Sequence, residues 1–530
     1  FHVHSPVAHF ARETPDHPAL SFAGEEMTYA ELEAASNQLA RALVERGVRS
    51  QDRVGIFLRK GLDLGVAIYG VLKAGGAFVP LDPFLPTERL ELILDDCGIR
   101  HLVSSDAMED ALGELRPGRD LSVLGVDAVD VGDATERSYE AVSWEEICAQ
   151  PATAPPDVRI LDLDLAYIMY TSGSTGVPKG MMHCHRGSLA YARWGAQHVG
   201  LGPQDRVASH APLHFDLSIF DFFSTSQVGG TVVLVPEPVT KFPASWTQTI
   251  QDERVGVVFT VPFTLIDMLE RGAMGERDLS SLRWILFGGE PFPPKHLRAL
   301  MRALPDVRFT NVYGPAEAPS CTCYDVPDLA EGDDEPIPIG TVSANSQDLV
   351  LDDDDAECGV GEEGELLIRS TTLTLGYWNR PDLNERVFFT RVGLGPFPEV
   401  YFRTGDLVVR HADGLLRFLG RKDRMVKTRG HRVELDEVEA ALASHAGVSE
   451  AAAFVVPDSH GSRTILAAVT VTAAGDGAPD AADVLRHART KLPAYAVPRE
   501  VDVRAALPRT TSGKIDRRRL AEESTTTSET

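Results

Sequence analysis

The chain has 530 residues, of which 43% are hydrophobic and 24% charged, and its formal net charge is -27. This is an ordinary globular composition, and the length predicts more than one domain because single cores stop growing at about 250–300 residues. A surface this acidic disfavours nucleic acid and anionic membranes as partners. The chain starts without a signal-peptide pattern and has no apolar run long enough to span a bilayer, so we expect a cytoplasmic enzyme.

The cysteines do not predict a metal site. The six of them are scattered and form no C-x-x-C pair, which argues against zinc. The tripeptide His183-Cys184-His185 could suggest a metal, but three adjacent residues cannot easily converge on one ion. We therefore interpret this tripeptide as an ordinary loop or the start of a helix.

Helices and strands are predicted to alternate along the first 330 residues. Helical spacing of apolar residues predicts helices at 27–43, with Thr28 as its cap, and at 64–74, ending at Gly75-Gly76. Short apolar runs predict strands at 54–58, 77–81, 102–104, 123–126, 165–170, 231–235, 256–260, 284–287 and 309–312. Alternation of this kind predicts an α/β fold, with parallel sheets and helices on both faces.

The second half of the chain predicts two further parts. Short strands at 348–351, 364–369 and 407–410 alternate with polar turns, which predicts a β-rich subdomain at 337–420. Beyond it, a helix after Glu434, strands at 451–456 and 466–472 and a helix at 482–491 predict a small α+β domain. We therefore expect an N-terminal core at 1–420, a hinge at 421–424, a mobile C-terminal lid at 425–522 and a disordered tail at 523–530.

A loop rich in hydroxyls and glycines follows the predicted strand at 165–170. It reads Thr171-Ser172-Gly173-Ser174-Thr175-Gly176-Val177-Pro178-Lys179-Gly180. Glycines let backbone N–H groups turn toward one point, hydroxyls add donors and Lys179 adds a charge, which together suit phosphates. The common phosphate loop of kinases and ATPases does not fit, because Pro178 and Gly180 stand where it has Gly and Ser or Thr. A flexible loop without a ligand is the alternative.

The complete string resembles the signature loop of the adenylate-forming (ANL) superfamily, which includes acyl-CoA synthetases, luciferases and the adenylation domains of nonribosomal peptide synthesis. In that family the loop wraps the β- and γ-phosphates of ATP. Further matches follow in the family's order from Met27 to Leu520, beginning with residues 72–83, which we interpret as a tight packing site between helix and strand. Taken alone, each later motif has a structural alternative. Residues 311–317 could be a Gly-Pro turn, Asp406 a capping residue, residues 420–434 a basic surface hairpin and Lys514 an exposed lysine.

The resemblance implies an ATP site with Mg²⁺. It assigns an adenine wall to Gly288, Gly289 and Glu290, stacking on adenine to Tyr313, the ribose hydroxyls to Asp406 with Arg421 nearby, and the metal to Glu317. The expected ATP-binding residues are Thr171, Ser172, Gly173, Ser174, Thr175, Gly176, Gly289, Glu290, Pro291, Asn311, Val312, Tyr313, Gly314, Pro315, Ala316, Asp406, Phe418 and Arg421. Ala316 stands where the family usually has Thr, which removes one hydroxyl near the α-phosphate.

Two lysines and one aspartate are expected to serve the reaction steps. The resemblance assigns Lys514 to the substrate carboxylate and the α-phosphate, and Lys179 belongs to the phosphate loop. Asp423 stands at the family's hinge position, about which the C-terminal domain would rotate between two half-reactions. Ser512 replaces the commoner Asn of the last motif, whose Lys and Gly remain.

The segment from His214 to Phe220 resembles the family's pocket-opening motif, in which Asp216 would hold the ammonium of an amino acid. A buried carboxylate without a partner is costly, so a cationic ligand group suits it, and a helix N-cap is the alternative. Aligned motif by motif, the substrate pocket comprises His214, Asp216, Leu217, Phe220, Thr260, Leu286, Gly288, Val312, Ser320 and Cys321. Apart from His214 and Asp216, none of these side chains carries a charge, which predicts a small neutral amino acid as the substrate.

We therefore expect a ligase that forms an aminoacyl-AMP with release of pyrophosphate and then loads the phosphopantetheine thiol of a carrier protein. The chain ends soon after the Lys514 motif, so we expect a freestanding enzyme whose carrier acts in trans. Alternatives within the class are a D-alanine–carrier protein ligase and activation of proline or a β-amino acid. A CoA ligase is a rival that Asp216 disfavours. A phosphate-loop kinase and a non-catalytic binding module are more distant rivals.

Overall fold

The computed structural model describes residues 1–127, 139–173, 178–392, 397–458, 463–472, 479–510 and 515–527. The chain divides into a large unit, Phe1–Pro83, Leu94–Tyr170 and Gly180–Lys422, and a small unit, Phe84–Ile93, Thr171–Lys179 and Asp423–Thr530. The division between Lys422 and Asp423 falls within the stretch predicted as a hinge.

The first sheet of the large unit is parallel in its centre and antiparallel at its edges. Its described strands follow the order β16 (Thr341–Val342), β15 (Thr322–Asp325), β14 (Arg308–Tyr313), β13 (Trp284–Gly288), β12 (Val257–Thr260), β10 (Arg206–Ser209), β11 (Thr231–Leu234), β1 (Pro18–Phe22) and β2 (Glu25–Thr28). All neighbours from β14 to β1 are parallel. The central strands are buried apolar runs, as expected for strands covered on both faces.

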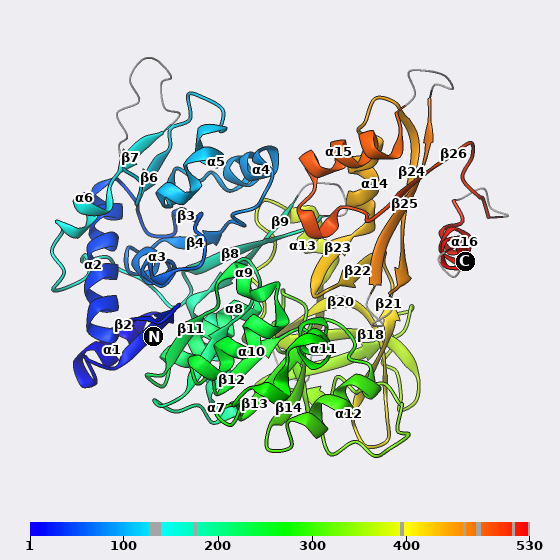
Figure 1. Cartoon of the computed structure of the whole chain (residues 1–530), viewed down its shortest axis with the longest axis horizontal. Helices are drawn as coiled ribbons and strands as arrows, with labels where there is room; N and C mark the ends of the chain where they lie inside the picture. The colour runs from blue at the N-terminus through cyan, green and yellow to red at the C-terminus, as the bar shows by residue number, and fades with distance from the viewer. Residues whose placement is uncertain are drawn as a thin grey trace. The chain divides into compact units, whose positions relative to one another are not determined.

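The second sheet of the large unit carries the strands on both sides of the phosphate loop. Its described order is β7 (Glu140–Val142), β6 (Ser122–Leu124), β5 (His101–Val103), β3 (Arg53–Ile56), β4 (Ala77–Pro80), β8 (Leu165–Thr171) and β9 (Lys179–Cys184). Figure 1 shows α2 (Tyr29–Glu45) beside α3 (Leu62–Lys73), which contacts β3 and β4. The fold confirms the expected alternation of helices and parallel strands.

The helices of the large unit begin where the sequence supplies start signals. Thr28 caps α2 through a capping box with Glu31, and proline occupies the first turn of α10, α11 and α12. These three helices are α10 (Pro243–Asp252), α11 (Pro262–Arg271) and α12 (Pro294–Ala303). The other α-helices are α1 (Ser5–Glu13), α4 (Thr87–Cys97), which begins in the small unit, α5 (Glu109–Gly113), α6 (Trp144–Cys148), α7 (His185–Val199), α8 (Leu217–Ile219), α9 (Glu237–Thr240) and α13 (Pro381–Val387).

A strand-rich region completes the large unit, as expected for the residues after 337. Its strands are β17 (Ser346–Leu351), β18 (Glu363–Ser370), β19 (Phe388–Val392), β20 (Pro398–Arg410) and β21 (Leu416–Arg421). They pair in the order β17-β18-β20-β19, and β21 pairs with β20. The pairing places Asp406 of β20 directly opposite Arg421 of β21.

The small unit is an α+β structure with its own core. The strands β24 (Val448–Pro457), β25 (Arg463–Val471) and β26 (Val501–Arg504) form its sheet, and β22 (Met425–Thr428) with β23 (His431–Glu434) forms a hairpin. Its core includes Val438 of α14 (Leu435–Ala443), Val469 of β25 and Val484 of α15 (Ala481–Lys491), all fully buried. This confirms the expected fold class.

Two predicted boundaries are wrong, and one predicted loop is not tested. Helix α16 (Arg517–Thr527) continues into the predicted disordered tail, because Arg518 pairs with Glu522 and Arg519 with Glu523 one turn apart, while Leu520 is buried. The predicted helix at 27–43 starts later because residue 27 belongs to β2. Most of the predicted loose loop after residue 472 lies outside the described residues.

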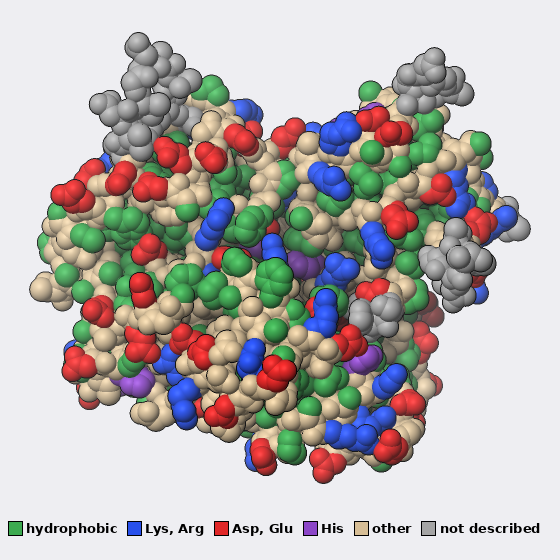
Figure 2. Space-filling view, in the orientation of Figure 1, with side chains coloured by type: hydrophobic (Ala, Val, Ile, Leu, Met, Phe, Trp, Pro, Cys, Tyr) green, Lys and Arg blue, Asp and Glu red, His purple; other side chains and the backbone are tan. Residues whose placement is uncertain are grey.

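The described part of the chain contains no helix long and apolar enough to cross a membrane. Figure 2 shows Lys and Arg interspersed with Asp and Glu on the face in view, so the acidic excess is not gathered into one patch there.

The glycine that ends α3 is required by its backbone conformation. Gly75 has φ +77°, its carbonyl accepts the Gln51 N–H at 2.7 Å, and an added Cβ would lie 2.9 Å from a methyl group of Val158. We expect Gly75→Ala to lower the free energy of unfolding by about 1–3 kcal/mol, because a side chain is strained at positive φ. Urea denaturation followed by circular dichroism measures it. Gly113→Ala, where nothing lies within 4 Å of the added Cβ, is the control; an equal loss in both variants would contradict this explanation.

Candidate active site

The carboxyl ends of three parallel strands bring four of the ten predicted pocket residues together. Thr260 ends β12, Gly288 ends β13, and Val312 lies one residue from the end of β14. Gly288 is directly opposite Val312, and Leu286 is opposite Phe259. Ligands of open α/β sheets bind at this edge, so the strand register gathers these positions where a site is expected.

A tight turn after β14 carries the next predicted residues. The Ala318 N–H donates to the Pro315 carbonyl at 2.9 Å, and a Cβ on Gly314 would lie 2.5 Å from the Ala318 carbonyl oxygen. Ser320 has φ +51°, and the Cys321 thiol lies 3.5 Å from the Tyr313 carbonyl oxygen. The strained residue at 320 turns the chain back beside β14.

Asp406 lies in a buried polar cluster with Tyr313 and Arg421. Its side chain is 3% exposed; it accepts a short hydrogen bond from the Tyr313 hydroxyl and pairs with the Arg421 guanidinium at 2.5 Å. Arg421 also donates to the Thr404 carbonyl at 3.1 Å. Burial and the Asp406 charge raise the pKa of Tyr313 well above its ordinary value. The structure thus joins three predicted nucleotide residues from β14, β20 and β21.

Glu317 is completely buried, and Tyr377 and His183 surround its carboxylate. The Tyr377 hydroxyl donates to Glu317 Oε1 at 2.5 Å, and the Thr374 N–H donates to the Glu317 carbonyl at 2.7 Å. Burial lowers the pKa of His183 to about 4, although the Glu317 charge opposes that shift. The His183 ring stacks on Tyr167 with 4.8 Å between centroids.

The arrangement around Glu317 is compatible with Mg²⁺ held by one carboxylate and substrate phosphates. Among the described residues, no group of three or more His, Cys, Asp or Glu side chains could hold a metal ion. Mg²⁺ needs no such cage, because it keeps several waters and usually takes one or two carboxylates plus phosphate oxygens. A fully buried carboxylate hydrogen-bonded to a neutral phenol fits that pattern.

Asp216 precedes α8 and lies near two buried phenols. Its charge contributes to raising the pKa of Tyr191 well above the ordinary value, although burial is the larger cause. Tyr167 is shifted in the same direction, again mainly by burial. The Ser320 hydroxyl donates to the Tyr191 hydroxyl at 3.4 Å, so Tyr191 joins two predicted pocket positions. Asp216 makes no side-chain cap bond to α8, which disfavours the N-cap alternative.

Bulky side chains occupy three of the predicted pocket positions. Phe220 is fully buried in a π-helical turn, Phe220–Ser224, and contacts Phe259 edge to face at 5.5 Å. A Cβ on Gly195 of α7 would lie 2.7 Å from the Phe220 ring, so α7 approaches this ring closely. Leu286 is also fully buried, and Leu217 packs partly buried against the same core.

A polar layer behind the pocket was not predicted. Lys60 donates to the carbonyls of Ser209 and His210 at 2.6 and 2.7 Å, and burial lowers its pKa to about 8. His210 Nδ1 lies 3.4 Å from the hydroxyl of the predicted pocket residue Thr260.

His214 links the pocket motif to the early packing motif. Its Nε2 lies 3.7 Å from an Asp82 carboxylate oxygen, so residues 72–83 contribute a side chain to the site as well as packing. Burial lowers the pKa of His214, although Asp82 opposes that shift.

The expected adenine wall is anchored at a helix start. Glu290 Oε1 accepts the Phe263 N–H of α11 at 3.1 Å, and Gly289 has φ +93°, a conformation that favours glycine before Pro291. The carboxamide of Asn311 donates to the Pro338 carbonyl at 2.8 Å, so that donor is engaged within the protein. Phe418 lies opposite Val408 in the strand-rich sheet.

The predicted phosphate loop is described only in part. Thr171 ends β8, the Ser172 hydroxyl donates to the Arg432 carbonyl at 2.9 Å, and Lys179 pairs with Glu434 at 3.4 Å, all within the small unit. Gly173 is described, whereas Ser174, Thr175 and Gly176 lie outside the described residues, as does Lys514. The roles of these four residues stay predictions.

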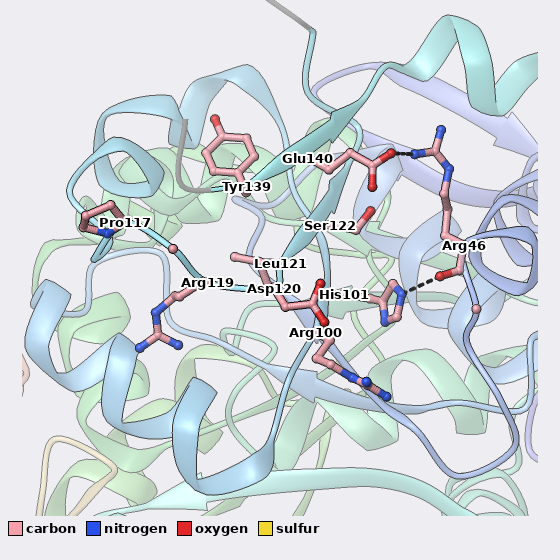
Figure 3. A pocket seen from close by; sticks show the side chains of 12 residues that line it. Arg46, Arg100, His101, Pro117, Arg119, Asp120, Leu121, Ser122, Tyr139 and Glu140 are labelled. Atoms are coloured by element: carbon pink, nitrogen blue, oxygen red, sulfur yellow. Dashed lines mark hydrogen bonds and ion pairs between the residues drawn. The ribbon is translucent and has the colours of Figure 1, made fainter. Parts of the chain in front are cut away.

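A separate cavity of about 690 Å³ contains none of the predicted site residues. Figure 3 shows Arg46, Arg100 and Arg119 around it, together with the acidic Asp120 and Glu140, of which Glu140 pairs with Arg46. Its mixed charges do not select one class of ligand, and it takes no part in the candidate site.

Parallel α/β sheets, a strand-rich region and a small α+β unit define the class of protein. The chain belongs to the AMP-binding enzyme family: the AMP-binding enzyme model matches residues 7–378, and the AMP-binding enzyme C-terminal domain model matches residues 437–514. The resemblance to adenylate-forming enzymes, and the expectation that the protein is an enzyme, are therefore confirmed.

Individual relatives match nearly the whole chain. An L-proline–[L-prolyl-carrier protein] ligase of Pseudomonas fluorescens is 36% identical over 522 residues, which are 98% of this chain and 99% of that protein. Tyrocidine synthase 2 of Brevibacillus parabrevis is 33% identical over 510 residues, 96% of this chain but only 13% of its own length. The solved structure of the amide bond synthetase McbA from Marinactinospora thermotolerans has a TM-score of 0.83 at 26% identity and covers 99% of both chains.

The residues that sequence reasoning missed are those recruited from distant elements. Tyr191, His210, Tyr377 and Lys60 carry polar atoms into a buried site, yet none belongs to a motif with a recognisable spacing. One signal was available for Tyr377, because Gly376-Tyr377-Trp378 follows the predicted strand at 364–369 and precedes Pro381.

The buried His210 makes the free energy of unfolding depend on pH in the acidic range. Burial, assisted by Lys60, lowers its pKa from 6.5 to about 3 in the folded state. The unfolded chain therefore binds the extra proton as the pH falls below 6.5, and this contribution to stability is progressively lost toward pH 3.

We expect His210→Phe to reduce the pH dependence of the unfolding free energy between pH 6 and 4.5 by up to about 1.4 kcal/mol per pH unit. Urea denaturation at several pH values measures the slope. His9→Gln, at an exposed histidine, is the control. Identical slopes for His210→Phe and the unmodified protein would show that His210 does not titrate in this way.

Proposed function

We propose that the protein activates a small neutral amino acid with Mg·ATP, forming an aminoacyl-AMP and pyrophosphate, and then transfers the aminoacyl group to the phosphopantetheine thiol of a separate carrier protein. The observation that carries the proposal is Asp216, a carboxylate placed beside the buried phenols of Tyr167 and Tyr191 and among otherwise neutral pocket residues. Asp216 is half-buried, and a substrate ammonium would be a cationic partner for its carboxylate. Family membership supports the adenylation chemistry.

The nucleotide would be held by residues from several elements. Tyr313 would stack on adenine beside the Gly288–Glu290 wall, and Asp406, which pairs with Arg421, would accept the ribose hydroxyls. Mg²⁺ at Glu317 would neutralise phosphate charge, and the phosphate loop with Lys179 would hold the leaving pyrophosphate. Because Tyr313 and Asp406 are hydrogen-bonded to each other, the ribose would exchange with an existing contact.

The chemical step needs positioning and charge stabilisation more than covalent catalysis. The substrate carboxylate attacks the α-phosphorus in line, and Lys514 would neutralise the charge shared by the attacking and transferred groups. Rotation at Asp423 would then exchange the Lys514 face for the 427–430 face before the thiol attacks. The division of the chain between Lys422 and Asp423 supports a hinge at that place.

The pocket residues and one relative narrow the range of candidate substrates. Phe220 and Leu286 are fully buried and would restrict the length of the substrate side chain, while Thr260, Ser320 and Cys321 are uncharged. The relative that bears the name of an L-proline–carrier protein ligase supports proline, whose secondary ammonium could also pair with Asp216. Alanine, serine and glycine, D-alanine, and a compact β-amino acid fit the same pocket. A CoA ligase for a simple acid would have no use for Asp216.

We expect ATP–pyrophosphate exchange to depend on an amino acid, with proline or another small neutral residue giving the highest rate. A panel of α-, β- and D-amino acids and their des-amino analogues measures this in one assay. The product should be AMP, because the nucleotide motifs are those of adenylate formation. Substrate-dependent ADP, or equal exchange with des-amino acids, would refute the proposed reaction.

Asp216→Ala should lower kcat/KM for the preferred amino acid by roughly two to three decades or more, because losing one partner of a buried charge pair costs about 3–5 kcal/mol. Steady-state exchange kinetics measure the loss. Asp306→Ala, at an exposed aspartate before β14, should retain normal kinetics and controls for the loss of one acidic side chain. Near-normal activity of Asp216→Ala would mean that another group holds the ammonium.

A further inference from the structure

We propose that residues 374–380 form a positioning strap for the active site. Tyr377 of the strap orients Glu317, and Trp378 of the strap together with Asp96 of α4 fixes the base of the phosphate loop. The inference rests on the proposed function for the roles of Glu317 and the loop. It adds three positioning residues, Asp96, Tyr377 and Trp378, that lie outside the motifs described above. All of the contacts that carry it lie within the large unit.

The strap runs along β9, the strand that follows the phosphate loop. The Trp378 N–H donates to the Gly180 carbonyl at 2.7 Å, the Leu375 N–H to the Met182 carbonyl at 2.8 Å, and the Met182 N–H to the Gly376 carbonyl at 3.0 Å. Met181 forms an antiparallel bridge with Tyr377. The strap therefore pairs with β9 like a short added strand, and it reaches Gly180, where the large unit resumes after the loop.

Asp96, near the end of α4, joins the strap to the strand before the loop. Its carboxylate accepts the Tyr170 hydroxyl at 2.6 Å and pairs with Arg380 at 3.0 Å. Its backbone carbonyl accepts the Trp378 indole N–H at 3.0 Å and the Asn379 carboxamide at 3.1 Å. One residue thus connects Tyr170, which precedes the loop, with the strap that holds Gly180.

The two sides of the loop base also pack directly on each other. A Cβ on Gly180 would lie 2.8 Å from the Tyr170 ring, so this ring covers the glycine closely. Glycine at 180 therefore serves the packing of the loop base, independently of any contact with phosphate. The spacing of Tyr170 and Gly180 is set by Asp96, Trp378 and this ring contact together.

The same strap holds the candidate metal ligand. Tyr377 is 4% exposed and Glu317 is fully buried, and the phenol donates to the carboxylate at 2.5 Å. Asn384 fixes Tyr377 by accepting its N–H at 2.8 Å and donating to its carbonyl at 3.2 Å. The Thr374 N–H donates to the Glu317 carbonyl, so the strap holds this residue by backbone and side chain.

This arrangement separates two parts of nucleotide recognition. The strap contacts the loop base and Glu317, which would serve the β- and γ-phosphates and the metal. The Tyr313, Asp406 and Arg421 cluster, which would serve adenosine, has its own contacts on β20 and β21. A defect in the strap should therefore weaken binding of ATP far more than binding of AMP.

The first experiment measures ATP and AMP dissociation constants by calorimetry for Asp96→Ala and Trp378→Phe. We expect ATP binding in the presence of Mg²⁺ to weaken about tenfold in Asp96→Ala, the scale of losing a charge-assisted hydrogen bond. AMP binding should change by less than about twofold. Asp95→Ala is the matched control, because Asp95 is the neighbouring residue of α4 and its carboxylate likewise forms ion pairs, here with Arg116 and Arg119.

Trp378→Phe removes the indole donor but keeps an aromatic ring and the backbone bond to Gly180, so it tests the strap with a smaller change if Asp96→Ala folds poorly. It should weaken ATP selectively as well. Equal weakening of ATP and AMP, or no weakening in either variant, would overturn the role of the strap at the loop base.

The second experiment tests Tyr377 through the metal. ATP binding is measured with Mg²⁺ and with EDTA, and the ratio gives the gain in affinity due to the metal. We expect Tyr377→Phe to reduce this gain about tenfold, as is typical when a side chain that orients a metal ligand is lost. Tyr401→Phe, which removes another buried phenol hydroxyl whose contacts are Glu399 and Arg391, should keep the full gain.

An unchanged gain in Tyr377→Phe would overturn the assignment of Tyr377. Neither experiment uses an amino acid or a carrier protein. Failure of amino-acid-dependent exchange would therefore refute the proposed function and leave the measurements on the strap interpretable.

Discussion

The parallel pairing of β12, β13 and β14 is the constraint on which the candidate site depends. Its register sets Gly288 opposite Val312 and aligns Thr260 with the end of the neighbouring strand. Tyr313, Glu317 and Ser320 then follow at the end of β14 and in the turn after it, so a change in register would move together the residues proposed to serve adenine, metal and substrate. Because side chains alternate along a strand, a slip by one residue would turn each of them to the opposite face.

Several buried ionisable groups of the candidate site have partners that limit the cost of their burial. Asp406 has Tyr313 and Arg421, Glu317 has Tyr377, and Lys60 donates to two carbonyls. Burial of a charge is expensive unless hydrogen bonds compensate for it, so these contacts hold the groups in fixed positions before any ligand arrives. Fixed dipoles and charges are what a phosphoryl or adenylyl transfer needs, since such reactions proceed mainly by positioning and electrostatic stabilisation.

The elements that hold the site come from distant parts of the chain. Asp96 precedes Tyr170 by 74 positions and Arg380 follows Asp96 by 284, yet all three meet at the base of one loop. The loop's sequence alone describes its glycines, hydroxyls and lysine, which are the groups that would face a phosphate. The strap and α4 instead determine the positions at which that loop begins and ends. These two positions constrain where the loop can place its phosphate-binding groups.

The sequence by itself determined the class of fold, the order of the elements and the identity of the motif residues. Short apolar runs, capping residues such as Thr28 and a glycine at positive φ such as Gly75 are local signals, because each depends on a few neighbouring residues. Likewise, the loop at 171–180 and the residues around Tyr313 and Asp406 could be recognised from adjacent letters. The helix at 517–527 was missed because its polar composition resembles a disordered tail, and only pairing along the helix and burial of Leu520 stabilise it.

Only the tertiary structure decided which residues support those motifs. Tyr191 approaches Ser320, His210 approaches Thr260 and Tyr377 binds Glu317 across long separations in the chain. No periodicity or spacing in one sequence encodes such meetings, because they depend on the register of parallel strands and on how a helix crosses a sheet. Burial then turns an ordinary Tyr, His or Lys into a group with a shifted pKa and a fixed partner, since removal from water makes every unmet hydrogen bond costly.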